Sequence, residues 1–227
     1  MCGRKTLTKG KLEIIEELSV EDWEDDYDFE PSYNVAPTQT HPILIHSNRR
    51  AVRGMRWGLV PFWAKDIKMG ARMINARSET VSEKPSFRNL IKRNRCIAIA
   101  DGYFEWQRKG SQKQPYFIHR PDNRLLPLAA LWDRWQQPDG SDLHSYTILT
   151  CAPSSDLAFI HDRMPVILAD SKMDTWLSDS LAEQEEILSL LHPPEAQLEF
   201  YPVSTQVNSV TNNSPENIVR ISNDLFS

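Results

Sequence analysis

Residues 95–107 of the chain read RCIAIADGYFEWQ, and this stretch decides the class of fold. Isoleucine alternates with alanine through residues 95–100, a pattern typical of a buried β-strand. Gly102 then marks a tight turn, after which Tyr103 and Glu105 share one side of the chain and Phe104 and Trp106 share the other. The stretch therefore predicts two short strands separated by a turn.

Similar strand patterns extend in both directions from this stretch. They cover residues 42–46, 51–57, 73–79, 115–119, 126–132, 146–151 and 198–203, and the sequences KGSQ, PDNR and PDGSD form turns between several of them. Helical periodicity appears at residues 11–18, where Thr8 is the expected cap and Leu12, Ile15 and Leu18 share a face, and at residues 86–93, 154–160, 171–177 and 181–191. No regular strand-helix-strand rhythm is present, so we predict an α+β fold with a curved, barrel-like, mainly antiparallel sheet flanked by short helices.

Composition sets limits on organisation and location. The chain has 227 residues with 40% hydrophobic and 25% charged content, and no long Pro-, Gly- or Ser-rich linker divides it, so we expect one domain over residues 1–227. No apolar run approaches the roughly 18 residues of a membrane span. We expect no membrane association, a monomer, and a cytoplasmic protein that is nucleoid-associated in a bacterium or nuclear in a eukaryote.

Cysteine and histidine spacing argues against a metal. The three cysteines lie far apart and the six histidines are scattered without an HExxH motif, so we expect reduced thiols, no metal and no cofactor. The net charge of −5 argues against a broad coat of nucleic acid. It leaves room for a local basic groove, because much of the acidity is concentrated in residues 21–30.

The N-terminal sequence MCGR places a cysteine directly after the initiator methionine. Removal of Met1 would give Cys2 a free α-amine, with a pKa near ~8 against ~10.4 for a lysine. An amine and a thiol on adjacent carbons can trap an aldehyde, first as a Schiff base and then as a five-membered thiazolidine ring. A cysteine at this position can equally be a buried, inert residue, and the tetrapeptide alone favours that interpretation.

Polar residues on other segments are candidates for chemistry. In residues 73–79 (MINARSE), Asn75, Arg77 and Glu79 share a strand face that suits phosphate recognition, or that simply faces solvent. Glu105 is a lone carboxylate among aromatic residues, a setting that suits a general acid or base but also a structural ion pair. His161, in the sequence HDRMP, could move protons or stabilise an oxyanion, or be ordinary loop surface.

Two turn-rich segments could expose flat apolar faces. The sequences YNVAP (33–37) and WGLVPFW (57–63) contribute Pro37, Phe62 and Trp63, on which single-stranded bases could stack. Packing in the core is the alternative, and it is the interpretation that we prefer for Trp57.

In this order, the sequences MCGR, YNVAP, WGLVPFWAKD, INARSE, ADGYFEW, KQPYFI and IHDRMPVIL resemble the SRAP family, the SOS response-associated peptidases or abasic-site shield proteins. The similarity spans nearly the whole chain and continues through TILTCAPSS and weakly through YPVSTQVNSVTNN. It implies one SRAP domain that binds single-stranded DNA and single-strand/double-strand junctions. It also implies that the N-terminal cysteine forms a thiazolidine with an abasic site and thereby shields the lesion during the DNA damage response.

The resemblance also assigns residues. The catalytic group it implies has Cys2 as nucleophile, Asn75 as its positioning residue, Glu105 for proton transfer and His161 as a second acid or base. For DNA contacts it implies Arg4, Arg77 and, more weakly, Arg163, with Pro37 and Trp63 as stacking surfaces. The segment EKPSFR (83–88) matches the family poorly where a residue is often inserted beside the lesion, so we do not assign that role to Phe87. Replication-fork proteins are further expected partners, and an abasic-site lyase activity and removal of the chain's own Met1 are associated activities.

Other classes of protein share some of these features. An N-terminal nucleophile hydrolase, such as a class II glutamine amidotransferase, also exposes a cysteine after Met1, but nothing in that pattern accounts for DGYFEW or HDRMP. A thiol peptidase is the older view that the family name retains. A noncatalytic single-strand binding module, in which Cys2 is incidental, is the third alternative.

Overall fold

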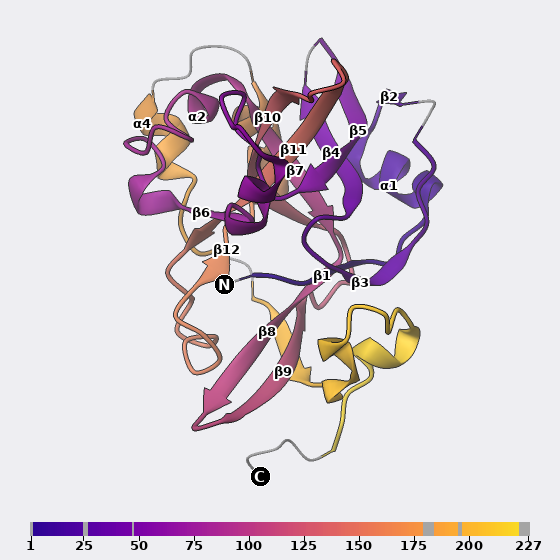
Figure 1. Cartoon of the computed structure of the whole chain (residues 1–227). Coiled ribbons are helices and arrows are strands. Elements are labelled where there is room, and N and C mark those ends of the chain that lie inside the picture. The colour runs from indigo at the N-terminus through magenta and orange to yellow at the C-terminus, as the bar shows by residue number, and fades with distance from the viewer. Residues whose placement is uncertain (1, 25–26, 47, 179–183, 195–196, 223–227) are drawn as a thin grey trace.

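Two β-sheets form the structure, a computed structural model that describes residues 2–24, 27–46, 48–178, 184–194 and 197–222. The larger sheet curls into a barrel and the smaller one lies below it in Figure 1, with the N-terminal end of the chain between them. This arrangement confirms the predicted α+β class with a barrel-like, mainly antiparallel sheet.

Five strands close the barrel. They are β4 (Thr40–His46), β5 (Arg50–Trp57), β7 (Arg95–Ala100), β10 (Leu126–Gln136) and β11 (Asp142–Cys151). Neighbours along the path β11-β10-β7-β4-β5 are antiparallel, and a parallel pairing of β11 with β5, through Ser145 with Arg56 and Tyr146 with Trp57, joins the two ends. Closure removes the exposed edges that an open sheet would present. The short strands β2 (Asp22–Trp23), β6 (Asn75–Arg77) and β12 (Met164–Pro165) pair with β5, β11 and β11 respectively.

The second sheet is antiparallel throughout, in the order β13-β9-β8-β1-β3. Its strands are β1 (Lys5–Leu7), β3 (Ser32–Val35), β8 (Gly102–Lys109), β9 (Gln112–His119) and β13 (Glu199–Pro202). The hairpin β8–β9 turns at KGSQ as predicted and extends away from the barrel (Figure 1). Since β7 and β8 are separated only by Asp101, the opening stretch of sequence joins the two sheets.

A close approach of backbone and side chain explains the glycine of DGYFEW. A Cβ atom on Gly102 would lie 2.3 Å from Cζ of Phe117, so only glycine fits where β8 begins against β9. Gly102 pairs with Thr6 of β1 on its other side. The strand that follows Cys2 is therefore set closely against the strand that carries Glu105.

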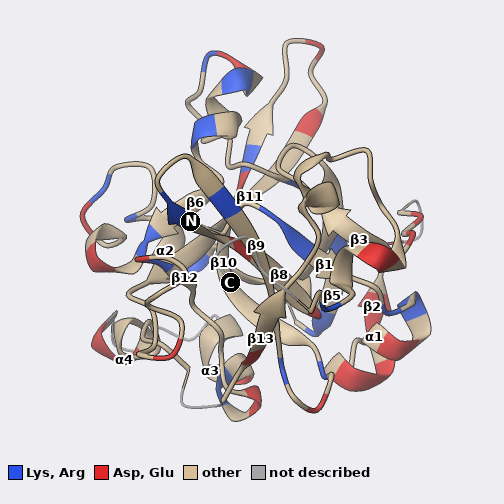
Figure 2. Cartoon of the chain, turned by 90° about the horizontal axis from the view of Figure 1, so that it is seen from below, with Lys and Arg blue, Asp and Glu red and all other residues tan. Residues whose placement is uncertain are grey.

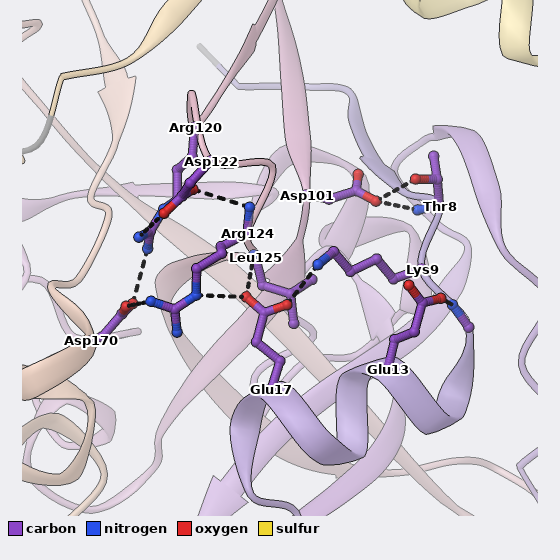
Figure 3. Close-up of polar contacts among 11 residues, drawn as sticks. Thr8, Lys9, Glu13, Glu17, Asp101, Arg120, Asp122, Arg124, Leu125 and Asp170 are labelled. Atoms are coloured by element: carbon purple, nitrogen blue, oxygen red, sulfur yellow. Dashed lines mark hydrogen bonds and ion pairs between the residues drawn. The ribbon is translucent and has the colours of Figure 1, made fainter.

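Polar contacts hold the N-terminal segment in place (Figure 3). The Asp101 carboxylate accepts hydrogen bonds from the side chains of Thr6 and Thr8, the latter at 2.7 Å. Glu17 then bonds Lys9 at 2.7 Å and accepts from the backbone N–H of Leu125 at 2.6 Å. These contacts tie both ends of the segment between β1 and the first helix to the loops of the barrel.

Helices are short and peripheral. They are α1 (Lys11–Leu18), α2 (Leu90–Arg93), α3 (Met173–Leu177) and α4 (Gln184–Ser189), with 3-10 turns at Ile67–Arg72, Ser78–Thr80, Asp170–Lys172, Thr205–Asn208 and Pro215–Ile218. The helix predicted at residues 11–18 is confirmed, whereas residues 154–160 form turns and residues 86–93 are helical only at their end. Residues 181–183 of the last predicted helix lie outside the described residues.

Two details predicted for α1 are wrong. Gly10, not Thr8, is the N-cap residue of the helix, and its backbone N–H donates a hydrogen bond to the Glu13 carboxylate at 2.8 Å. Leu12 is 80% exposed while Ile14 and Leu18 are buried, so the buried stripe is rotated from the predicted face. The side chain of Thr8 instead satisfies Asp101.

Candidate active site

The candidate site lies where β1, β6, β8 and the HDRMP loop meet. Cys2 lies just before β1, and the carbonyl oxygen of Arg4, between them, accepts a hydrogen bond from the N–H of Phe104 in β8 at 3.0 Å. Strand β6 approaches from the barrel through its parallel pairing with β11. The structure thus brings together four residues proposed from sequence for the chemistry, Cys2, Asn75, Glu105 and His161.

A hydrogen bond to its backbone holds Cys2 in place. The side-chain amide of Asn75 donates a hydrogen bond to the backbone carbonyl oxygen of Cys2 at 2.7 Å. The Asn75 carboxamide oxygen is buried and accepts no hydrogen bond from the described residues. Asn75 therefore fixes the position of the N-terminal residue and retains an acceptor for a further donor.

The sulfur of Cys2 is sheltered. Cys2 is completely buried, and its Sγ donates a long hydrogen bond of 4.0 Å to the carbonyl oxygen of Arg4. Burial raises the pKa of the Cys2 thiol to about 12, and the negative charge of Glu105 contributes to the increase. The sulfur is accordingly a neutral thiol at physiological pH.

Glu105 and His161 face one another across the site. Oε1 of Glu105 lies 4.0 Å from Nε2 of His161, and the Glu105 side chain is only 6% exposed against 24% for His161. Glu105 is on the side of β8 that its alternation predicts, and His161 is on the loop between β11 and β12. A carboxyl group and an imidazole at this separation can exchange protons with a group placed between them.

The His161 ring has two polar neighbours at Nδ1. The backbone N–H of Arg163 donates to Nδ1 at 3.0 Å, an arrangement that leaves the proton of the neutral ring on Nε2, toward Glu105. The Asp162 carboxylate lies 2.8 Å from the same Nδ1 and forms an ion pair when the ring is protonated. The loop therefore supports the neutral and the cationic forms of His161 by different contacts.

The Arg163 guanidinium is bonded to other groups of the protein. Its guanidinium pairs with Glu79 at 2.6 and 2.9 Å and also donates to the carbonyl oxygen of Thr150. Glu79 therefore leaves the strand face predicted for it, because the chain enters a 3-10 turn after Arg77. Arg77 is exposed and lines the cavity beside Glu105 and His161.

The other residues proposed for DNA contact lie in different settings. Arg4 is held by the side chain of Asn34 at 2.7 Å and the carbonyl oxygen of Val207 at 2.8 Å. Trp63 is 45% exposed and Pro37 is half-buried, and neither is among the described residues that line the cavity at Glu105. Trp57 is buried in the core, as preferred from sequence, and Phe87 packs against that core.

A cavity of about 720 Å³ opens beside Glu105 and His161. Six lining residues were not proposed as site residues from the sequence: Ile74, Trp106, Arg108, Lys113, Asp162 and Asn208. The available signal was the basic sequence around the KGSQ turn, QRKGSQK. Figure 2 shows Lys and Arg segments across the middle of this view, near the N-terminus and β6, whereas acidic segments gather on α1 at the rim.

The described part of the chain shows neither a cluster of metal ligands nor a membrane-spanning helix. Its His, Cys, Asp and Glu side chains form no group of three or more arranged to hold a metal ion. None of its helices has both the length and the apolar character of a transmembrane span.

In this chain the fold places Cys2, Asn75, Glu105 and His161 together at the junction of two sheets. The chain belongs to the SRAP family, whose model, described as SOS response associated peptidase (SRAP), matches residues 1–210.

Relatives of known name cover most of the chain. The abasic site processing protein YoqW of Bacillus subtilis is 44% identical over 220 residues, which cover 95% of this chain and 98% of that protein. The abasic site processing protein HMCES of Gallus gallus is 36% identical over 263 residues, which cover 97% of this chain and 78% of that protein.

Solved structures share the fold. A Bacteroides thetaiotaomicron protein superposes with a TM-score of 0.87 at 28% identity, over 97% of this chain and all of that chain. A Bordetella bronchiseptica protein superposes with a TM-score of 0.76 at 25% identity, over 89% of this chain and all of that chain.

Proposed function

We propose that this protein senses and shields abasic sites in single-stranded DNA by forming a covalent crosslink through Cys2 after removal of Met1. Relatives named abasic site processing proteins, 36 to 44% identical, support an abasic-site function in the response to DNA damage. The observation that carries the proposal is the 2.7 Å hydrogen bond from Asn75 to the Cys2 carbonyl oxygen, which holds the N-terminal residue beside Glu105 and His161.

The order of bond formation follows from the state of the two nucleophiles. The Cys2 thiol has a pKa of about 12 and stays protonated, whereas a free α-amine has a pKa of about 8 and is partly neutral. The amine therefore attacks the C1 aldehyde of the ring-opened deoxyribose first, and loss of water gives a Schiff base. The thiol then adds across the C=N bond, sulfur binding carbon while the thiol proton passes to nitrogen, and the thiazolidine closes with water as the only other product.

Glu105 and His161 divide the proton transfers. Opening of the deoxyribose ring requires a proton on the ring oxygen, and loss of water from the carbinolamine requires another on the departing hydroxyl. His161, the more exposed of the two side chains, lies on the cavity wall and serves the sugar. Glu105 is buried and lies close enough to Cys2 for its charge to raise the pKa of the thiol, so it serves the amine and the thiol. The same groups would support strand scission at the lesion, the associated lyase activity.

The DNA partner is a single strand or a single-strand/double-strand junction. We propose that Arg77 contacts a phosphate from the cavity wall and that Trp63 and Pro37 offer stacking surfaces outside it. We also propose that Arg4 and Arg163 contact the DNA. Arg4 is held in place by Asn34 and Val207, and Arg163 lies beside His161. We further propose that residues 1–227 act as one domain, as a monomer, near the replication fork and the chromosomal DNA.

The sheltered sulfur argues for this function over a thiol peptidase or an N-terminal nucleophile amidotransferase. Those reactions begin with attack by a thiolate, which a pKa of about 12 disfavours. Attack by the α-amine does not require the thiolate. The aldehyde of an abasic site is thus a better match to this site than an amide.

A crosslinking experiment tests the proposal. The processed protein is mixed with a single-stranded oligonucleotide that carries one abasic site and is then denatured; we expect a covalent adduct for wild type and none for Cys2→Ala. The matched control is Cys96→Ala, which removes another buried free thiol, in strand β7 of the barrel, and should still crosslink. Absence of an adduct from wild type with a verified Cys2 terminus would overturn the proposal.

A further inference from the structure

Two cations lie directly opposite each other on the β8–β9 hairpin. Arg108 of β8 is paired in register with Lys113 of β9, and both side chains are exposed. Residues opposite one another on antiparallel strands have Cβ atoms about 5 Å apart, and like charges there are destabilising by about 0.2 to 1 kcal/mol. The hairpin therefore carries an electrostatic cost that its own fold does not require.

Within the described residues this repulsion is not relieved. No ion pair or side-chain hydrogen bond with a described residue involves Arg108 or Lys113. Other arginines of the chain differ: Arg163 is paired with Glu79, and Arg120 is paired with Asp122 and Asp170. Two exposed like charges with no acidic partner in the described part of the chain suit an external anion.

The pair belongs to the wall of the cavity that contains the candidate site. Arg108 and Lys113 line it together with Glu105 and His161. The two acidic lining residues, Glu105 and Asp162, lie near the reacting terminus, and Asp162 is in contact with His161. The lining therefore holds four cations, Arg77, Arg108, Lys113 and Arg163, against these two acidic side chains.

An aromatic residue connects the pair to the N-terminal strand. Trp106 precedes Arg108 by two residues and so shares its side of β8. Its indole N–H is fixed by Asn208 at 2.7 Å, and the Arg4 guanidinium lies 6.0 Å from its ring centre. Cations that alternate with an aromatic side chain are the usual surface for a single strand of nucleic acid.

We infer that Arg108 and Lys113 form a phosphate clamp for the DNA strand that leaves the candidate site along the β8–β9 hairpin, an inference that rests on the proposed function. A chain with a net charge of −5 needs such a local concentration of cations to hold a polyanion. Figure 1 shows the hairpin extending past the barrel, and Arg108 and Lys113 on its two strands line the cavity. The clamp contacts the sugar-phosphate backbone and is indifferent to base sequence.

Salt dependence of binding to undamaged DNA tests the clamp. The affinity of an oligothymidylate of about 20 nucleotides is measured by fluorescence anisotropy over a range of salt concentrations. Each phosphate contact to a single strand contributes about 0.7 to the slope of log K against log salt, so the double variant Arg108→Ala/Lys113→Ala should lose about 1.4. At about 0.1 M salt its binding should be about 25-fold weaker than wild type.

Matched variants separate the clamp from total charge. Lys92→Ala/Arg93→Ala removes two exposed cations from α2, at the opposite end of the molecule from the hairpin in Figure 1, and should leave the slope unchanged. Arg108→Lys keeps the charge and should keep the slope. The Arg108→Ala/Lys113→Ala variant should also be at least as stable as wild type in thermal unfolding, because it relieves the cross-strand repulsion.

An unchanged slope in Arg108→Ala/Lys113→Ala, or an equal loss in the α2 variant, would overturn the clamp. Undamaged DNA contains no aldehyde, so this result is independent of the chemistry at Cys2. If the slope changes as expected but wild type forms no adduct with abasic DNA, the proposed function fails while the clamp stands. If wild type forms the adduct and the slope is unchanged, the clamp alone fails.

Discussion

Oε1 of Glu105 and Nε2 of His161 are separated by 4.0 Å, with the carboxyl group on the buried side and the imidazole on the cavity side. The separation exceeds that of a direct hydrogen bond, which for these atoms is about 2.7 to 3.2 Å. An oxygen of the substrate can therefore lie between the two groups and receive a proton from one while the other acts on the N-terminal amine.

Glu105→Gln preserves the shape of the side chain but removes its ability to take up or release a proton. We expect adduct formation or reversal to slow by about 10²-fold, the usual lower range for loss of a general acid or base, while DNA affinity changes little. Single-turnover rates on abasic single-stranded DNA measure this effect. Glu186→Gln, on the exposed side of α4, is the control, and wild-type kinetics in Glu105→Gln would leave Glu105 with a structural role only.

A second prediction concerns the state of the chain terminus. Protein that retains Met1 has no α-amine on Cys2, and we expect it to form no adduct although it binds the oligonucleotide with nearly the same affinity. Intact-mass measurement establishes the state of the terminus, and denaturing electrophoresis detects the adduct. Equal crosslinking by the Met1-retained form would contradict attack by the amine.

Asn75→Ala removes the hydrogen bond to the Cys2 carbonyl oxygen. Loss of a buried hydrogen bond that is worth about 1 to 3 kcal/mol should slow adduct formation by roughly 5- to 150-fold, since the nucleophile is no longer held in place. The first-order rate at saturating DNA reports this change separately from affinity. Asn89→Ala, at an exposed position, should react at the wild-type rate.

The close approach at Gly102 predicts a loss of stability. A methyl group there would meet the Phe117 ring, so Gly102→Ala should lower the free energy of unfolding by about 1 to 3 kcal/mol through overpacking. Chemical denaturation measures the change. Gly110→Ala is an instructive comparison, because no atom lies within 4 Å of its Cβ position and its cost arises only from a positive φ of 61°. A stability of Gly102→Ala equal to that of wild type would show that β8 can shift.

His41 predicts sensitivity to acid. Burial, together with the positive charge of Lys5, lowers the pKa of His41 to about 2 in the folded protein, against 6.5 for the ordinary side chain. Below pH 6.5 the unfolded chain binds a proton that the folded chain does not, so stability falls as the pH decreases, by up to about 1.4 kcal/mol per pH unit. The loss should begin near pH 6.5, and unfolding curves between about pH 7 and 4 should show a smaller slope for His41→Gln. Parallel pH profiles of the two proteins would rule out a buried neutral His41.

Strands were predictable where burial leaves a local pattern. The predicted strand at residues 95–100 and the predicted helix at residues 11–18 both have the bounds seen in the structure. Strand β1 was missed because Lys5 and Thr6 are polar yet completely buried, and their partners are the distant Ile99 carbonyl oxygen and Asp101. Barrel closure likewise depends on the pairing of Tyr146 with Trp57, which no local pattern indicates.

The site was predictable as a set of residues but not as a geometry. Alternation along DGYFEW predicted the side of β8 that carries Glu105, and Asn75 and Arg77 share a strand as expected. The sequence did not indicate that Arg163 would be held by Glu79, because the 3-10 turn after β6 is set by tertiary contacts. The cations of QRKGSQK were interpreted only as flanks of a turn, since cross-strand register is needed to bring Arg108 opposite Lys113.

The hydrogen bond from Asn75 ends on the main chain of residue 2 and not on its sulfur. This hydrogen bond does not depend on the side chain at position 2, so an alanine or serine there would be held in the same place. A processed protein with such a replacement keeps the α-amine and the hydrogen bond from Asn75 but lacks the thiol. Its reaction with the aldehyde can reach the Schiff base but cannot close the thiazolidine, so this form separates the first bond from the second.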